Sequence, residues 1–451
     1  MRVGVAHRDS AVLSTAAASR STRTILILVL AALVVRIAVI PFVIDEHLKP
    51  ARDHWKFGWE EGKIARSLAT GQGFSSPFFE RTGPTAWTTP VYPGLLAGVF
   101  WLFGVYTRAS AWAILILNAV FASLTGIPVY FLARRGFGPP AAFWAGWVWT
   151  LHPYSIFLSS SFIWGNCLDA LMMALLLWVT LAIEDQTSLV RWIGYGLLWG
   201  VAALNNAVVL STLPFLLGWL AWRRQRRGRA WRLSTIATLL TLALTVSPWF
   251  VRNYATFGRF IPFRDTFWLV FWMGNTGDAS APYPDWANPA HNDAELAKYY
   301  RLGELGYMQE KRSASLDYLR QHPGLFLRTS AKRFLFTWTG FWSFRPAYLA
   351  AEPLEFANIG FCAALTALLL AGLRRAYLLN RPAVLPFALV LLSYPLVYYF
   401  THTDIDYRHP IDPVAAVFMG VLIAGWRRKH TKSGAGFGTT EFVSESPGLR
   451  G

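Results

Sequence analysis

The sequence is poor in charged residues and in cysteine. Only 15% of its 451 residues are charged and 54% are hydrophobic, whereas about 25% of residues are charged in an average soluble domain. Cys167 and Cys362 both lie in or beside apolar segments, so the sequence suggests neither a disulfide framework nor a cysteine metal site. No heptad pattern, tandem repeat or soluble domain is found. These absences exclude an ordinary soluble protein.

Long apolar runs are present instead. Several of them approach or exceed the roughly 18 to 20 residues that cross a bilayer. We therefore predict an all-α, multi-pass transmembrane helical bundle of about ten spans. Residues 91–105 are apolar but too short to cross, so they are expected to form a re-entrant or surface helix. The expected spans are residues 24–43, 110–133, 140–158, 162–183, 191–205, 207–222, 233–250, 354–373, 383–400 and 411–426.

The net charge of +17 is explained by signals that orient the chain in the membrane. The arginines sit mostly in short clusters beside apolar runs, as positive-inside signals do, so nucleic acid is not an expected partner. We expect a protein of the cell inner (plasma) membrane with both termini cytoplasmic. Residues 1–23 and 429–451 are predicted to be disordered and cytoplasmic, around a transmembrane domain at 24–428. Its outer loops would be residues 44–109, with extracytoplasmic juxtamembrane helices, and 251–353.

Two acidic residues stand out in the first outer loop. Asp53 and Glu60 are seven residues apart, which on a helix places them on nearly the same face, two turns from one another. A half-shielded carboxylate can act as a general base on an acceptor. The alternative is an ordinary juxtamembrane helix in which Glu60 pairs with Lys63.

Arginines on the outer side run against the usual charge bias. Arg252, Arg259 and Arg264 follow the seventh span and could clamp the phosphate of a lipid carrier; the alternative is anchoring of a long loop to head groups. In the same outer region, Asn292 and Glu295 have the spacing of a helix N-cap and its partner. They predict a helix that stops at His322-Pro323.

Other polar groups cluster at helix ends. Arg408 and His409 lie in the turn before the last span and could neutralise a departing phosphate, although a self-neutralising turn is the alternative. Asn206 could bind substrate or satisfy a backbone break. Asp169 lies about one turn inside a span, where an acid usually faces the bundle interior. No metal ligands are predicted.

Aromatic residues also enrich the first outer loop. Trp87 and Tyr92 suit either the membrane interface belt or stacking on a sugar ring. The surrounding stretch resembles bacterial relatives of protein O-mannosyltransferases and aminoarabinose transferases, which are GT-C class integral-membrane glycosyltransferases. The segments that carry the resemblance are residues 62–74, 84–93, 103–104, 133–138, 248–254 and 407–410.

The resemblance implies a function. In that class the first outer loop supplies the acidic catalytic residue, which selects Glu60, with Asp53 as second candidate. We expect inverting transfer of a sugar from a polyprenyl-phosphate-linked donor in the bilayer to an extracytoplasmic protein or lipid acceptor. The resemblance fixes no cofactor, and the need for a divalent cation stays open. The alternatives are a transporter or flippase of lipid-linked sugars, or a glycan polymerase or ligase.

Overall fold

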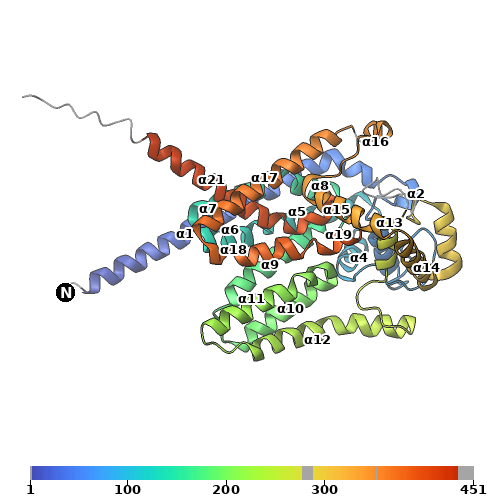
Figure 1. Ribbon diagram of the computed structural model, residues 1–451, viewed down its shortest axis with the longest axis horizontal. Coiled ribbons are helices and arrows are strands. Elements are labelled where there is room, and N and C mark those ends of the chain that lie inside the picture. Colours follow the sequence, from blue (N-terminus) through green and yellow to red (C-terminus); the bar gives the residue numbers. More distant parts are fainter. Residues whose placement is uncertain (1–2, 277–287, 352, 435–451) are drawn as a thin grey trace, which may run out of the picture.

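The computed structural model describes residues 3–276, 288–351 and 353–434. Across these residues the chain is almost entirely helical and has no strand, only an isolated bridge between Ser75 and Pro84. Seven helices are long and apolar enough to cross a membrane (Figure 1). The predicted all-α, multi-pass membrane bundle is therefore confirmed. The seven helices are Ser21–His47, Arg108–Phe137, Asn166–Ile183, Arg232–Phe257, Glu355–Leu379, Arg381–Phe400 and Ile405–Arg427.

The three other predicted spans are present as shorter helices. Residues 140–158 divide into α7 (Pro139–Thr150) and α8 (Pro153–Ser161), because His152 caps α8 and accepts a hydrogen bond from the Ser155 amide. The arms around Asn205-Asn206 are α10 (Leu189–Asn205) and, after the 3-10 turn η1 (Ala207–Ser211), α11 (Leu213–Arg226).

A fully buried arginine supports the break between α7 and α8. Arg36 lies in the first helix and donates hydrogen bonds to the carbonyls of Trp149 and Thr150 and to the hydroxyl of Ser155. A charge at this depth is costly unless it is paired or hydrogen-bonded. Here its donors satisfy carbonyls that the broken helix leaves open.

The ends of the chain follow the prediction in part. Helix α1 (Val3–His47) already begins at Val3, so residues 3–23, which we expected to be disordered, are helical. Helix α21 (Asp412–Gly434) likewise continues beyond residue 429, and residues 435–451 lie outside the described part of the chain. The start of α1 and the end of α21 lie at the same end of the molecule (Figure 1).

The opposite end of the molecule holds the outer segments (Figure 1). Residues 91–103 form the short α4 (Val91–Phe103), as predicted. Asn292 accepts hydrogen bonds from the amides of Ala294 and Glu295, and α14 stops at Gln321, so both predicted ends are confirmed. The helix is kinked at Gly303, and the Glu295 side chain binds Lys311 and Tyr307 and not the cap. The elements there include α2 (Ala51–His54), α3 (Trp59–Ala69), α13 (Phe267–Asn275), α14 (Asp293–Gln321), α15 (Pro323–Thr339) and α16 (Pro346–Ala351).

The two outer segments share one apolar cluster. Trp55, Phe78 and Trp87 of the first segment pack with Tyr299 and Tyr307 of α14. Aromatic side chains bury a large area each, so this cluster fixes the first loop against α14. The remaining helices complete the bundle. They are α5 (Arg108–Leu124), α6 (Gly126–Phe137), α9 (Asn166–Ile183), α12 (Arg232–Phe257), α17 (Glu355–Leu379), α18 (Arg381–Ser393), α19 (Leu396–Phe400), α20 (Ile405–Arg408) and the 3-10 turn η3 (His409–Ile411).

Candidate active site

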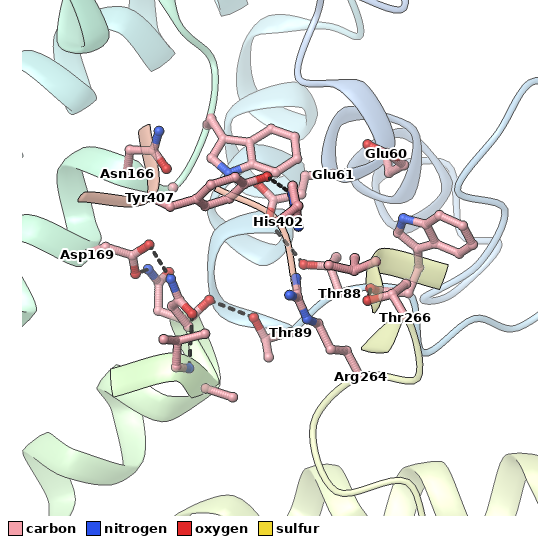
Figure 2. Close-up of a pocket in the computed structure, with 18 of the residues that line it drawn as sticks. Glu60, Glu61, Thr88, Thr89, Asn166, Asp169, Arg264, Thr266, His402 and Tyr407 are labelled. Carbon is pink, nitrogen blue, oxygen red and sulfur yellow. Dashed lines mark hydrogen bonds between the residues drawn. The ribbon is translucent and has the colours of Figure 1, made fainter. Parts of the chain in front are cut away.

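A cavity that is open to solvent lies where the outer segments meet the ends of the spans. Its wall combines acidic, amide, hydroxyl and aromatic groups from segments far apart in the sequence (Figure 2). Glu60 and Glu61 come from α3, Asp169 from α9, Arg264 from the segment before α13, and His402 from the turn after α19.

Two glycines place the acids of α3 in this wall. Gly58 has φ of 91°, a left-handed conformation that suits glycine, and α3 begins directly after it. A Cβ atom on Gly62 would lie 1.9 Å from the carbonyl oxygen of Phe57, so no larger residue fits there. The tight turn brings Glu60 and Glu61 inward at the first turn of α3.

Glu60 is buried, with 6% of its surface exposed. Burial raises the pKa of its carboxyl to about 7, while hydrogen bonds from Trp87 and Asn288 act in the opposite direction. A carboxyl with a pKa near neutrality can accept a proton and still exist largely as its base form at pH 7 and above. Glu60 therefore has the properties of a general base.

Glu61 lines the same cavity and is equally buried. One oxygen, Oε1, accepts a hydrogen bond of 3.1 Å from the Thr88 hydroxyl. Burial raises the pKa of Glu61 to about 8, and the charges of Asp169 and Glu60 contribute to the rise. Two adjacent acids thus face one cavity with different partners.

Asp169 holds the break between α10 and η1. Its two oxygens accept hydrogen bonds from the side-chain amides of Asn205 (2.6 Å) and Asn206 (2.9 Å) (Figure 2). Asn206 in turn accepts a hydrogen bond from the Val208 amide. Asn206 therefore lines the cavity and also satisfies the backbone break, which unites the two interpretations that its sequence left open.

Arg264 supplies the positive charge. It is the one lysine or arginine among the described residues that line the cavity, and its guanidinium points toward His402 and Thr88 (Figure 2). Within the described chain it makes no hydrogen bond or ion pair, so its donors are open to a ligand. Its charge acts on Glu60, Glu61 and Asp169.

His402 is neutral in this setting. Its Nε2 atom is 2.8 Å from the Tyr407 hydroxyl. Burial lowers the pKa of His402 to about 3, helped by the positive charges of Arg264 and Arg333. Arg333 donates to the carbonyl of Tyr399 and to the side chain of Asn275, which ties this turn to α13.

Residues 85–89 form the wall between the two outer segments, and a buried carboxylate holds them. Glu304 of α14 accepts hydrogen bonds from the Thr85 hydroxyl, the Ala86 amide (2.6 Å) and the Tyr299 hydroxyl (3.0 Å). Asp265, whose amide donates to the Ala86 carbonyl, lies beside it. Burial raises the pKa of both carboxyls, and their proximity raises that of Asp265 further.

A second cavity adjoins the first and shares five lining residues with it. Glu60, Trp164, Asn166, Asn288 and Tyr407 line both cavities. The second has an aromatic wall with acids at one side: Trp55, Trp59, Phe162, Asp404 and Asp406. Glu60 is thus the glutamate at the junction of the two compartments, whereas Glu61 faces the first alone.

Asp53, the second candidate base, lies outside both cavities. Arg52, Asp53 and His54 have left-handed backbone angles, so the predicted continuous helix from Asp53 to Glu60 is wrong. Asp53 binds Lys63 (2.8 Å) and Arg66 (2.6 Å). Burial alone would raise the pKa of Asp53, but these two hydrogen bonds outweigh it and hold the pKa below its ordinary value.

Arg252 and Arg259 also do not line either cavity. Arg252 donates to the carbonyls of Thr85 (2.7 Å) and Phe74 (2.8 Å) and stacks on Trp249. Its donors therefore hold the first outer loop against α12, which removes the expected phosphate contact. Arg259 is exposed on the segment after α12.

Arg408, His409 and Tyr92 are buried away from the cavity. Arg408 and His409 both contact Asp412 at 3.2 Å, and His409 stacks on Trp149. The interpretation as a self-neutralising turn fits this geometry, and the predicted contact with a departing phosphate does not. Tyr92 donates a hydrogen bond to Asn118 beneath the site.

Four predicted residues line the cavity: Glu60, Arg264, Trp87 and Asn206. Sequence reasoning missed Glu61, Thr88 and Asn205. The adjacent pair Glu60-Glu61 was a usable signal, because two acids in the first turn after a glycine cannot both be explained by Lys63. Among the described residues no three His, Cys, Asp or Glu side chains come together to hold a metal ion.

Comparisons with known proteins were made on sequence and on fold. The family model of dolichyl-phosphate-mannose-protein mannosyltransferases matches residues 87–251, less than half of the chain. This match confirms the predicted resemblance to protein O-mannosyltransferases for that segment. No curated protein matches at a significant level.

Several solved structures share the fold. The oligosaccharyltransferase AglB from Archaeoglobus fulgidus, in complex with an inhibitory peptide and a dolichol-phosphate, has a TM-score of 0.52 and 15% identity over 93% of this chain. A second structure of the A. fulgidus oligosaccharyltransferase, in complex with Zn and sulfate, has a TM-score of 0.52 and 15% identity over 90% of this chain. This chain covers 52% and 50% of those chains, so it spans about half their length.

A third structure matches with a lower score. ArnT from Cupriavidus metallidurans, bound to undecaprenyl phosphate, has a TM-score of 0.39 and 16% identity over 91% of this chain and 79% of its own. The AglB likeness shows that this chain shares the fold of that structure, and the seven long apolar helices fit a multi-pass membrane protein.

Replacing Glu304 tests what holds the cavity wall. Glu304→Ala leaves the donors of Thr85, Ala86 and Tyr299 without their acceptor in a buried place, so we expect a loss of at least about 2 kcal/mol. The measurement is the thermal unfolding midpoint in detergent, together with the rate of proteolysis in residues 80–90. Glu310→Ala on the same helix is the matched control, because its partner Lys298 is near the surface and such pairs contribute at most about 1 kcal/mol. Equal effects of the two variants would show that Glu304 does not hold this wall.

Proposed function

We propose that the chain is a membrane glycosyltransferase that moves a sugar from a polyprenyl-phosphate-linked donor to an extracytoplasmic protein or lipid acceptor, with inversion. The observation that carries the proposal is the position of Glu60. It lines two adjoining cavities, one of which contains Arg264 with open donors and the other an aromatic wall. A base between a phosphate-binding compartment and an acceptor compartment is what direct sugar transfer needs.

Glu60 acts as the general base in this proposal. Its carboxylate takes the proton from the acceptor hydroxyl or amine as that group attacks the anomeric carbon of the donor sugar. The bond from the anomeric carbon to the phosphate oxygen breaks, and its electron pair stays on the phosphate. Attack from the face opposite the phosphate inverts the anomeric configuration.

Arg264 stabilises the phosphate as it departs. A guanidinium matches phosphate geometry with two parallel hydrogen bonds, and negative charge develops on the leaving group in the transition state. Because no carboxylate neutralises Arg264 through an ion pair in the described chain, its full charge meets the phosphate. Trp87 and Asn206, which line this compartment, would contact the sugar.

The fold supports a lipid-linked donor. AglB, whose fold this chain shares, was solved with a dolichol-phosphate. The residues that line the cavity here come from the outer segments and the adjoining ends of the spans, so a prenyl chain can remain in the bilayer while its phosphate reaches Arg264. No step requires a metal ion, and the need for a divalent cation is a separate measurement.

The cavity is placed on the extracytoplasmic face of the inner (plasma) membrane in this proposal. The start of α1 and the end of α21 lie together at the far end (Figure 1), and the arginine cluster between α11 and α12 follows the last turn of α11. The positive-inside rule assigns that cluster, and both termini, to the cytoplasm.

Substitution of the base tests the mechanism. Glu60→Gln keeps the shape of the side chain but removes proton acceptance, so we expect kcat to fall by at least roughly 100-fold. Asp53→Asn is the control, because Asp53 lies outside the cavities and its loss affects stability alone. The assay reconstitutes the protein with a radiolabelled polyprenyl-phosphate sugar and an acceptor extract. If wild type moves the lipid without cleaving it, the transporter alternative replaces this proposal.

The pH dependence gives a second test. Below its raised pKa of about 7 Glu60 is protonated and cannot accept the acceptor proton, so activity falls as pH falls. We expect kcat/KM to rise with pH through a limb near 7 and to drop about tenfold per pH unit below it. The profile is measured on protein that retains its folded fluorescence across the range. A limb near pH 4, typical of an unperturbed carboxyl, would contradict the assignment of Glu60.

A further inference from the structure

Two buried oxygen atoms in the cavity wall have no role in the mechanism above. They are Oε2 of Glu61 and Oδ1 of Asn205, and neither has a hydrogen-bond partner among the described residues. Both residues line the cavity and are more than nine-tenths buried. Buried polar atoms are nearly always hydrogen-bonded, so exceptions in a cavity wall indicate a missing partner.

The rest of each side chain is fixed. Oε1 of Glu61 accepts from the Thr88 hydroxyl, and the amide nitrogen of Asn205 donates to Asp169. That second contact defines which atom of the Asn205 amide is the oxygen, because only nitrogen can donate to a carboxylate.

The two side chains belong to one part of the wall. Thr89, the neighbour of Thr88, donates to the backbone carbonyl of Asn205 at 2.6 Å (Figure 2). The Thr88-Thr89 pair therefore bridges Glu61 to Asn205. Both threonine hydroxyls already direct their protons at the wall, so this side of the cavity offers acceptors to a ligand.

A hydroxyl group is the ligand chemistry that fits such a wall. It can donate to Asn205, and it can both donate to and accept from Glu61, whichever protonation state that carboxyl has. A carboxylate has no proton to donate, so it cannot pair with the Asn205 oxygen, and it would meet a like charge wherever Glu61 is ionised.

We propose that Glu61 and Asn205 form a specificity subsite that reads hydroxyl groups of the transferred sugar and selects neutral sugars over uronic acids. The subsite deepens the proposed function, on which it rests, by naming the class of sugar. Arg264 holds the phosphate, and the acceptor side of Glu60 is not involved. A site built to hydrogen-bond a hydroxyl rejects an analogue that lacks it, because its own buried groups are then left unpaired.

Binding measurements test the subsite without requiring turnover. The purified full chain in nanodiscs is titrated with polyprenyl phosphate alone, with polyprenyl-phosphate glucose, galactose and mannose, and with the three matching uronic acids. Fluorescence of Trp87 and Trp164, which line the cavity, reports binding. We expect at least one neutral sugar to bind roughly tenfold more tightly than polyprenyl phosphate, and its uronic acid to gain nothing.

The Glu61→Gln variant should lose that tenfold preference and keep the wild-type affinity for polyprenyl phosphate alone. The retained affinity also shows that the variant is folded. Glu80→Gln, an exposed residue of the same outer segment, is the matched control and should behave as wild type. Deoxy analogues of the preferred sugar, titrated into wild type, give a measurement that depends on no variant. We expect at least one of them to lose the preference.

Three results would overturn the subsite: no sugar preference in wild type, an equal preference in Glu61→Gln, or tighter binding of the uronic acids. Transfer activity is measured on the same preparations. Sugar preference without transfer would refute the proposed function and leave the subsite standing, whereas transfer with an unchanged preference in Glu61→Gln would refute the subsite alone.

Discussion

The buried carboxylate of Glu304 is the contact on which the site depends. It accepts hydrogen bonds from Thr85 and Ala86, residues more than 200 positions earlier in the chain, and so joins the two outer segments. Arg252 holds the same stretch from the side of α12 through the Thr85 carbonyl. Without these anchors, Trp87, Thr88 and Thr89 would form a loose loop, and the cavity would lack the wall that orients both Glu60 and Glu61. The free-energy cost of burying the Glu304 side chain is offset because each of its carboxyl oxygens accepts a hydrogen bond.

Charge is distributed unevenly within the cavity. Three carboxyls, Glu60, Glu61 and Asp169, face a single arginine, Arg264. Burial disfavours the charged carboxylates and brings Glu60 to a pKa suited to proton transfer, while Asp169 is fully engaged by two amides. The same environment thus leaves one acid with a pKa that suits the proposed base, one as a structural anchor and one with an open oxygen. Environment, more than residue type, separates these roles.

The sequence predicted the fold better than the site. Apolar runs are local signals, so seven of the ten predicted spans lie close to their observed bounds, and Asn292 marked the start of α14 correctly. Glu60 and Arg264 were named, yet Arg252, twelve residues before Arg264, carries the same side chain and faces backbone carbonyls instead. Which arginine meets the cavity depends on tertiary packing. The left-handed residues Arg52, Asp53 and His54 broke the helix that was expected to align Asp53 with Glu60, and none of these three is a glycine. Gly58, which is also left-handed and directly precedes α3, was the one signal of a break between the two acids.

The central claim is that Glu60 lies between a phosphate held by Arg264 and an acceptor in the aromatic compartment. A cryo-electron microscopy structure of the full chain in nanodiscs with bound polyprenyl phosphate tests it most directly. The account predicts phosphate density within hydrogen-bonding distance of the Arg264 guanidinium, in the compartment that Glu60, Glu61 and Asp169 share, with the prenyl chain leaving toward the bilayer. Phosphate bound at Arg252, at Arg408 and His409, or outside both cavities would contradict it.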